Sequence, residues 1–189
     1  MNQALHLTQI AAFTPFNETE AAHQRAMLSF VKRHHNFYKR TLVPGHVTGS
    51  AWIIDPTCNH ALMLHHKKLN RWLQPGGHIE EELDVLSSAL REAQEETGIP
   101  DLKALGDAIF DLDIHVIPGN KKEAEHQHYD IRYLFEAELA TIPSVSDESN
   151  DVRWFTLDEI SKINSDASIQ RMILKTIALK KNRIVSLLR

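Results

Sequence analysis

The sequence predicts a mixed α/β fold from three observations. A helical pattern over about residues 84–97 follows a Gly-Gly turn, apolar strand-like runs lie on both sides of it, and amphipathic helical stretches occur towards both ends. With 189 residues and 42% hydrophobic content, the chain can bury one core. We therefore expect one domain at residues 45–165, with a helical extension at 1–44 packed on it and a C-terminal helix of the same domain at 166–189.

The extension is expected to be mainly one helix from about Glu18 to Arg40. Its apolar residues form a broad helical stripe, and Thr14-Pro15-Phe16-Asn17 provides a start signal. Covering one side of the core is a more frequent role for such a helix than contact with substrate.

Strands and short helices are expected along the rest of the chain. Residues 47–54 and 61–66 flank a Pro/Asn turn, as the two strands of a hairpin would. The remaining expected elements are a short strand at 72–73, one or two strands within 102–116, a loop at 118–123, a strand at 129–139, a loop at 141–150, a strand at 152–155, a short capped helix at 156–160 and a helix at 168–188.

The helix at about 84–97 carries the strongest functional signal. Asp84 is a suitable N-cap, and Gly98 with Pro100 would end the helix. Glu92, Glu95 and Glu96 are spaced i, i+3 and i+4, which places them on one helical face.

These three carboxylates lie near the C-terminal end of the helix, where the dipole is already negative. Arg91 can pair at i,i+4 with Glu95 and neutralise one of them. Oxygen ligands in this number suit Mg²⁺ or Mn²⁺. The alternative to a metal site is a charged, solvent-facing helix after a turn.

Residues 77–99 resemble the Nudix hydrolase signature, G-x5-E-x7-R-E-U-x-E-E-x-G-U, where U is a bulky apolar residue. The matching positions are Gly77, Arg91, Glu92, Glu95, Glu96, Gly98 and Ile99. Leu83 replaces the first glutamate, and Ala93 is small for its apolar position. Seven fixed positions in one short window make a specific signal.

The resemblance implies an α/β/α sandwich around a mixed sheet and metal-dependent hydrolysis of a diphosphate bond. It assigns Glu92, Glu95 and Glu96 as metal ligands, with the carbonyl of Gly76 or Gly77 as a further ligand. It also assigns Glu92, Glu95 and Arg91 to catalysis. Glu92 is our choice of base, and Arg91 orients Glu95 and the loop.

Two positions bear on the completeness of this site. The glutamate lost at Leu83 is usually a secondary metal contact, for which Glu82 or Asp84 could partly compensate. Glu148 lies six residues before Trp154, and in some Nudix enzymes a glutamate at that offset joins the metal site. Glu123 and Glu125 compete for the same role.

A second cluster lies on the strand expected near residues 126–132. If the segment is extended, its alternate side chains share one face: His126, His128, Asp130 and Arg132. Such a face can contact substrate or metal, or it can be a hydrogen-bonded polar edge strand, and the sequence leaves both open. A zinc site is disfavoured because no second ligand pair is evident, although His115 could approach across the sheet.

Arg71 ends a basic run at residues 65–71 that could meet phosphate oxygens, although such a run is more often a solvated turn.

Charge and cysteine content limit partners and location. The formal net charge of −4 disfavours a long nucleic acid as substrate, and no window predicts a membrane span or a signal peptide. The single cysteine, Cys58, lies in a predicted turn as an inert or partly exposed thiol and suits the reducing cytoplasm.

The leading hypothesis is a Mg²⁺-dependent hydrolase acting on a small-molecule diphosphate, such as a nucleoside diphosphate linked to another moiety. The alternative is a catalytically weakened Nudix-fold module for nucleotide binding or regulation. The isopentenyl diphosphate isomerase branch needs a core cysteine, which Cys58 does not match. Whether the chain forms a homodimer is left open.

Overall fold

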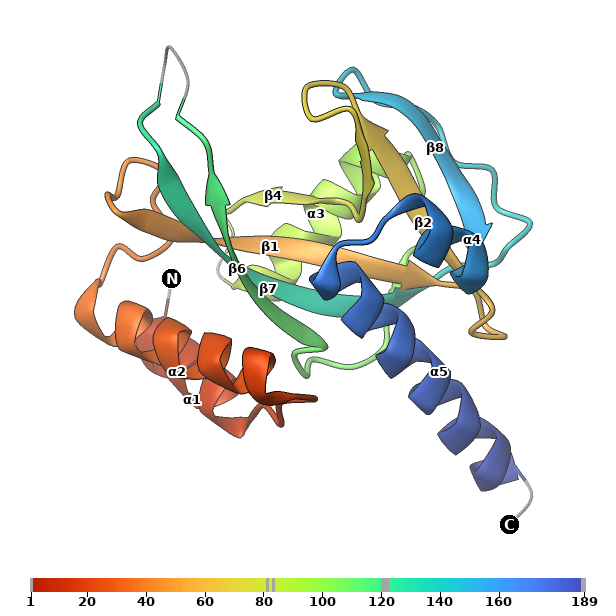
Figure 1. Cartoon of the computed structure of the whole chain (residues 1–189), viewed down its shortest axis with the longest axis horizontal. Coiled ribbons are helices and arrows are strands. Elements are labelled where there is room, and N and C mark those ends of the chain that lie inside the picture. Colours follow the sequence, from red (N-terminus) through yellow and green to blue (C-terminus); the bar gives the residue numbers. More distant parts are fainter. Residues whose placement is uncertain (1, 81, 83, 120–122, 188–189) are drawn as a thin grey trace. The chain divides into compact units, whose positions relative to one another are not determined.

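The computed structural model describes residues 2–80, 82, 84–119 and 123–187. The elements follow each other along the chain as shown in Figure 1. They are α1 (Gln3–Ala12), α2 (Glu18–Arg33), β1 (Gly45–Ile54), β2 (His60–His66), β3 (Arg71–Leu73), β4 (Gly76–His78), α3 (Val85–Thr97), β5 (Lys103–Ala104), β6 (Asp111–Ile117), β7 (His126–Glu136), β8 (Ser149–Thr156), α4 (Leu157–Ile163) and α5 (Ala167–Leu187).

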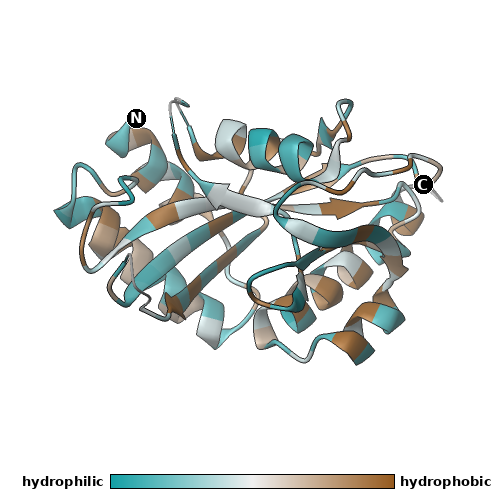
Figure 2. Cartoon of the chain, turned by 90° about the horizontal axis from the view of Figure 1, so that it is seen from above, coloured by the Kyte–Doolittle hydropathy of each residue, from teal (hydrophilic) through white to brown (hydrophobic). Residues whose placement is uncertain are grey.

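The eight strands form one mixed sheet, in which five neighbouring strands follow the order β3-β2-β1-β7-β5. Three further pairs are antiparallel: β8 with β2, β4 with β1, and β6 with β7. Strands β1 and β7 run parallel, because Gln127 N donates to Pro44 O (2.9 Å) and Ala137 N donates to Ile54 O (3.1 Å) with the same sequence offset. The predicted α/β fold with a mixed sheet is therefore confirmed. Both hydrophobic and hydrophilic residues occur along its strands (Figure 2).

The chain comprises two compact units, and β1, β7 and α3 contribute residues to both. The first unit holds Met1–Ala51, Gly76–Glu92 and Gly106–Tyr133. The second holds Trp52–Pro75, Ala93–Leu105 and Leu134–Arg189.

In the first unit, the N-terminal helices pack on each other and α2 contacts β6. The ring of Phe30 stacks on that of Tyr129 with centroids 3.9 Å apart. The buried carboxylate of Glu20 accepts a hydrogen bond from Leu112 N at 3.2 Å. The N-terminal helices thus pack against β6 and β7, and the predicted limits of the extension stay a prediction.

The helix boundaries in this region differ from the prediction. Helix α2 ends at Arg33 and not near Arg40, because His34 has extended backbone angles and residues 34–36 are two histidines and an asparagine, which favour helix weakly. Helix α1 was not predicted. Its N-cap is Asn2, whose side chain accepts a hydrogen bond from Leu5 N.

In the second unit, β1 and β2 form the predicted hairpin, with Ile54 opposite Ala61. The carboxylate of Asp55 closes the turn by accepting hydrogen bonds from the backbone N–H groups of residues 57, 59 and 60. Cys58 lies in this turn but is buried, not partly exposed, and burial raises the pKa of its thiol. A thiol with a raised pKa is a poor nucleophile at neutral pH.

The C-terminal helices form as predicted. Thr156 and Glu159 make a reciprocal capping box at the start of α4. Trp52 Nε1 donates to Thr176 Oγ1 of α5 at 2.9 Å, which ties α5 to β1 within this unit. No helix among the described residues is long and apolar enough to span a membrane.

The strands predicted within 102–116 correspond to β5 and to β6, which extends one residue further to Ile117, and the later strand predictions are confirmed by β7 and β8. The short strand β4 was not predicted. The expected loop at 118–123 includes residues 120–122, and the predicted C-terminal helix includes Leu188; these residues lie outside the described part of the chain.

Candidate functional site

Helix α3 has the limits that its capping residues predict. Asp84 Oδ1 accepts a hydrogen bond from Ser87 N at 2.8 Å, so Asp84 is the N-cap. At the other end, Gly98 has a φ of +65° and its N–H donates to Gln94 O at 2.8 Å. Glycine takes this left-handed conformation readily, so the helix ends after Thr97.

The segment before α3 approaches that helix more closely than a side chain would allow. Gly76 and Gly77 belong to β4 and pair with Ser50 and Gly49 of β1. A Cβ atom on Gly77 would lie 2.5 Å from the carboxylate carbon of Glu92. Glycine at position 77 therefore lets the backbone pack directly against the Glu92 carboxylate.

Arg91 fixes the loop to the helix. One of its Nη atoms donates to His78 O (2.8 Å) and to a carboxylate oxygen of Glu92 (3.0 Å), and its Nε donates to Glu82. Burial alone would raise the pKa of Glu82, but the hydrogen bond from Arg91 lowers it to about 2. Arg91 thus contacts both the loop and α3, and its predicted role in orienting the loop and Glu95 stays a prediction.

Glu82 was one of two residues expected to compensate for Leu83. Its carboxylate also accepts hydrogen bonds from Glu80 N (2.9 Å) and Ser88 Oγ (3.1 Å), so it serves to hold the loop. Leu83 itself lies outside the described residues.

The three predicted metal ligands differ in exposure along α3. Glu96 is buried with 7% of its surface exposed, Glu92 is half-buried and Glu95 is exposed. Their spacing on one continuous helix is confirmed, and metal binding by them stays a prediction.

The other predicted site residues of the second unit are exposed. Glu148 precedes β8 and accepts a backbone hydrogen bond from Lys67 N at 3.0 Å. Arg71 begins β3 and lies 3.4 Å from the carboxylate of Asp166.

The two alternatives to Glu148 lie in the first unit. Glu123 pairs with Arg40 at 2.6 Å, and Glu125 is exposed.

The side chains of Asp130 and Arg132 are buried in the first unit. Both residues are 2% exposed, and Arg132 Nε donates to Asp130 Oδ2 at 2.7 Å. Thr48 and Ser50 donate to the other oxygen of Asp130, at 2.9 and 2.8 Å. These contacts confirm that alternate residues of β7 share a face with those of β1.

Arg132 is enclosed by carboxylates from the neighbouring strand. It donates to Asp111 at 3.2 Å and to Asp113 at 3.1 Å, in addition to Asp130. Burial works to lower the pKa of the guanidinium, but the carboxylates together raise it above its ordinary value. This charge network therefore stabilises one face of the sheet.

Histidines occupy the same face beyond this network. His46 of β1 lies with its ring centroid 5.0 Å from that of His78, 5.1 Å from His126 and 4.8 Å from His128. His115 of β6 pairs directly opposite His128, with centroids 5.5 Å apart. The approach of His115 across the sheet, considered from the sequence, is thus confirmed.

The ring nitrogens of this cluster lie in positions suited to a metal ion. Among the described residues, His46, His78 and His128 form a group in which one ligand atom from each lies within 4.8 Å of the others. Burial and neighbouring imidazoles lower the pKa of His46 to about 4 and that of His128 to about 2. Arg40 also lowers the pKa of His46, whereas Glu123 raises it.

Sequence reasoning missed His46 and His78. Both lie far from residues 126–128 in the chain, and only the pairing of β1 with β4 and β7 brings them together. The available signal was the alternation of His46 with Thr48 and Ser50 on one strand, which needs the strand register before it becomes informative.

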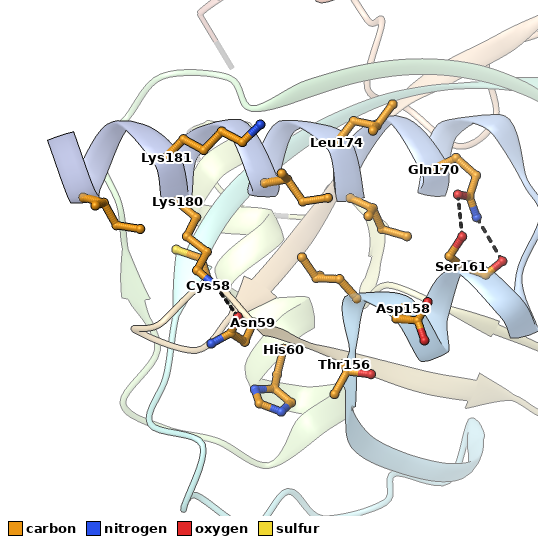
Figure 3. A pocket seen from close by; sticks show the side chains of 14 residues that line it. Cys58, Asn59, His60, Thr156, Asp158, Ser161, Gln170, Leu174, Lys180 and Lys181 are labelled. Atoms are coloured by element: carbon orange, nitrogen blue, oxygen red, sulfur yellow. Dashed lines mark hydrogen bonds between the residues drawn. The ribbon is translucent and has the colours of Figure 1, made fainter.

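The second unit contains a cleft with a volume of about 910 Å³ (Figure 3). It lies among the β1–β2 turn, α4 and α5, and apolar side chains of α5 face it. Polar contacts occur at its edge, including the hydrogen bond from Lys180 to Asn59 and the pairing of Ser161 with Gln170. None of the predicted site residues lines this cleft.

Comparisons with known proteins agree with the motif and the fold. A model of the NUDIX domain matches residues 45–176. A protein of Lactococcus lactis subsp. cremoris (strain MG1363), named probable DHNTP pyrophosphohydrolase, is 40% identical over 87 residues, covering 42% of this chain and 51% of that protein. The chain thus matches about half the length of this relative.

Two solved structures show the same fold. An Ap4A hydrolase of C. elegans in a binary complex has a TM-score of 0.58 at 19% identity, covering 72% of this chain and 98% of that one. The dihydroneopterin triphosphate pyrophosphohydrolase of E. coli has a TM-score of 0.51 at 16% identity, with 67% and 91% covered. Since the domain model spans well over half of the sequence, the chain belongs to the Nudix family.

Proposed function

We propose that the protein hydrolyses a diphosphate bond in a small molecule, either a nucleoside diphosphate linked to another moiety or a similar compound. Its cofactor is Mg²⁺, with Mn²⁺ as a substitute, and it works in the cytoplasm. The observation that carries this proposal is α3, where Glu92, Glu95 and Glu96 follow the Gly-Gly segment at helical spacing. The names of the Lactococcus and E. coli proteins support the type of bond.

The residues of the loop and helix fit a hard divalent cation. Glu92, Glu95, Glu96 and the carbonyl of Gly76 would hold it, because Mg²⁺ prefers oxygen ligands. The close packing of Gly77 on the Glu92 carboxylate keeps this site compact. When bound, the ion supplies neutralisation of phosphoryl charge and a lowered pKa of coordinated water.

The protein groups then act on the water and the substrate. Glu92 accepts the proton of the attacking water, and Arg91 holds the Glu92 carboxylate through the 3.0 Å contact. Glu95 completes the set of catalytic ligands, and Glu148 is a further metal ligand contributed by the loop before β8.

Substrate contacts fall to Arg71 and His126, which are at least partly exposed. We assign Asp130 and Arg132 to the fold instead, because both are 2% exposed and paired with each other. A guanidinium that is buried among three carboxylates is not available to a phosphate group.

The rival function is a catalytically weakened module that binds a nucleotide for regulation. The feature that favours it is Leu83 in place of the first glutamate of the signature. The presence of Glu92, Glu95 and Glu96 favours the hydrolase.

The test is product formation from a panel of diphosphates with Mg²⁺ or Mn²⁺. The panel should contain nucleotide sugars, dinucleotides including Ap4A, CDP-alcohols, oxidised nucleotides and dihydroneopterin triphosphate. We expect turnover of at least one compound, and a loss of about two to three orders of magnitude in kcat for Glu95→Gln or Glu96→Gln. Glu138→Gln is the matched control because Glu138 is exposed elsewhere on the chain.

Wild type that binds a nucleotide but hydrolyses no member of the panel would support the rival function. Near-normal turnover of Glu95→Gln or Glu96→Gln at saturating Mg²⁺ would show that the altered residue is not a ligand. Mg²⁺ should also raise the Tm of wild type more than that of Glu92→Gln/Glu96→Gln.

A further inference from the structure

The histidine cluster brings together ligand atoms from three strands of the first unit. His46 comes from β1, His78 from β4 and His128 from β7, and their ligand atoms lie within 4.8 Å of one another. Tetrahedral zinc with Zn–N bonds of 2.0–2.1 Å requires nitrogens roughly 3.4 Å apart. Binding would therefore draw the nitrogens closer together by up to about 1.4 Å.

The buried ring of His46 lacks the hydrogen bonds that such a group normally makes. Its relative exposure is 0%, and neither Nδ1 nor Nε2 has a hydrogen-bond partner among the residues that the structure describes. Burying an imidazole without a partner is unfavourable, and such atoms in native proteins call for an explanation. A metal ion that accepts the lone pair of one nitrogen supplies the missing interaction.

From this geometry, we propose that His46, His78 and His128 bind a divalent transition-metal ion of the zinc type, at a site separate from the carboxylates of α3. Imidazole nitrogen favours Zn²⁺, Co²⁺, Ni²⁺ or Cu²⁺ over Mg²⁺, which prefers oxygen. Three histidines leave one coordination position for water, as in sites with an open position.

The protonation states agree with this assignment. Metal binding requires neutral imidazole, and both His46 and His128 have pKa values well below 6.5 because they are buried near other histidines. At neutral pH these two ligands therefore need not lose a proton before they bind the ion.

His126 positions the cluster from its edge. Its Nδ1 lies 2.9 Å from Ala124 O, so this nitrogen carries the proton that it donates to the carbonyl. The lone pair is then on Nε2, which lies 3.3 Å from Nε2 of His128. The backbone hydrogen bond holds the ring of His126, which in turn contacts the ring of the proposed ligand His128, so His126 is a positioning residue.

The experiment uses the full chain after EDTA treatment and removal of the chelator, with excess Mg²⁺ present to occupy the carboxylates. We expect one Zn²⁺ bound per chain, and a Co²⁺ complex with the visible absorption of four-coordinate cobalt. His46→Gln/His128→Gln should weaken zinc binding roughly 100-fold or more. His35→Gln, at an exposed histidine outside the cluster, should leave it unchanged.

Two results of the binding measurement would overturn the proposal. One is the absence of zinc binding above the Mg²⁺ background in wild type, and the other is equal affinity in the cluster variant and the His35 variant. If the cluster variant does not fold, imidazole nitrogen NMR of wild type decides the question. Zinc should shift the resonances of His46, His78 and His128, and unshifted resonances would contradict the proposal. None of these measurements depends on hydrolase activity.

Discussion

Replacing Gly77 with alanine tests the close packing between the Gly-Gly segment and the proposed catalytic helix α3. The new Cβ would lie 2.5 Å from both the Cδ and the Oε1 atoms of Glu92. Ordinary carbon contacts are about 3.5–4.0 Å, so the carboxylate must move by roughly 1 Å. A displacement of this size in a catalytic group can lower the rate about 100-fold.

The effect on stability should be much smaller. The carboxylate of Glu92 is the far end of a flexible side chain, so it can move at the cost of its 3.0 Å contact with Arg91. One such hydrogen bond contributes about 1–2 kcal/mol. For a chain of this length that loss corresponds to a decrease in Tm of roughly 2–8 °C.

The assay compares kcat, KM and Tm of Gly77→Ala and Gly76→Ala with those of wild type, on the best substrate of the panel. A Cβ on Gly76 would lie 2.7 Å from the Cα of Ser50, which is backbone and cannot move easily, so Gly76→Ala should lose more stability. Near-normal kcat for a folded Gly77→Ala would refute the assigned role of the Glu92 position.

Three further changes test other parts of the structure. In EDTA, the free energy of unfolding should fall as pH drops from 6.5 towards 4, because unfolded His46 takes up a proton that the folded state resists. Urea denaturation at several pH values measures this dependence. His46→Gln should reduce the change in unfolding free energy with pH by up to about 1.4 kcal/mol per pH unit. Arg132→Met should destabilise the fold by about 3–5 kcal/mol, because it leaves buried carboxylates uncompensated; a loss below 1 kcal/mol in the same assay would show that the network is dispensable. Leu83→Glu should change the Mg²⁺ concentration for half-maximal activity more than the maximal rate; wild type that is inert while Leu83→Glu is active would favour the binding module.

Helix α3 was predictable because its signals are local. Asp84, Gly98 and the spacing of the apolar residues determine where α3 begins and ends, and each acts within a few residues of its own position. The capping box at Thr156 made the start of α4 predictable for the same reason.

The histidine site could not be predicted because its ligands meet only through strand pairing. His78 is opposite Thr48 in the register of β4 with β1, and no local pattern specifies that register. The burial of Arg132 could not be predicted either. It depends on Asp111 and Asp113, which lie on β6, and the pairing of β6 with β7 cannot be derived from the sequence alone. The end of α2 was predicted too late in the chain, because apolar Phe37 and Tyr38 continue the helical stripe beyond Arg33.

His78 contributes to two separate features of the molecule through different atoms. Its imidazole belongs to the histidine cluster, whereas its main-chain carbonyl accepts the hydrogen bond from Arg91. Replacing the side chain leaves the carbonyl in place, so a Nudix relative could exchange this histidine for another residue and still anchor the segment before α3. The two features can therefore be gained or lost independently during evolution, even though one residue carries both.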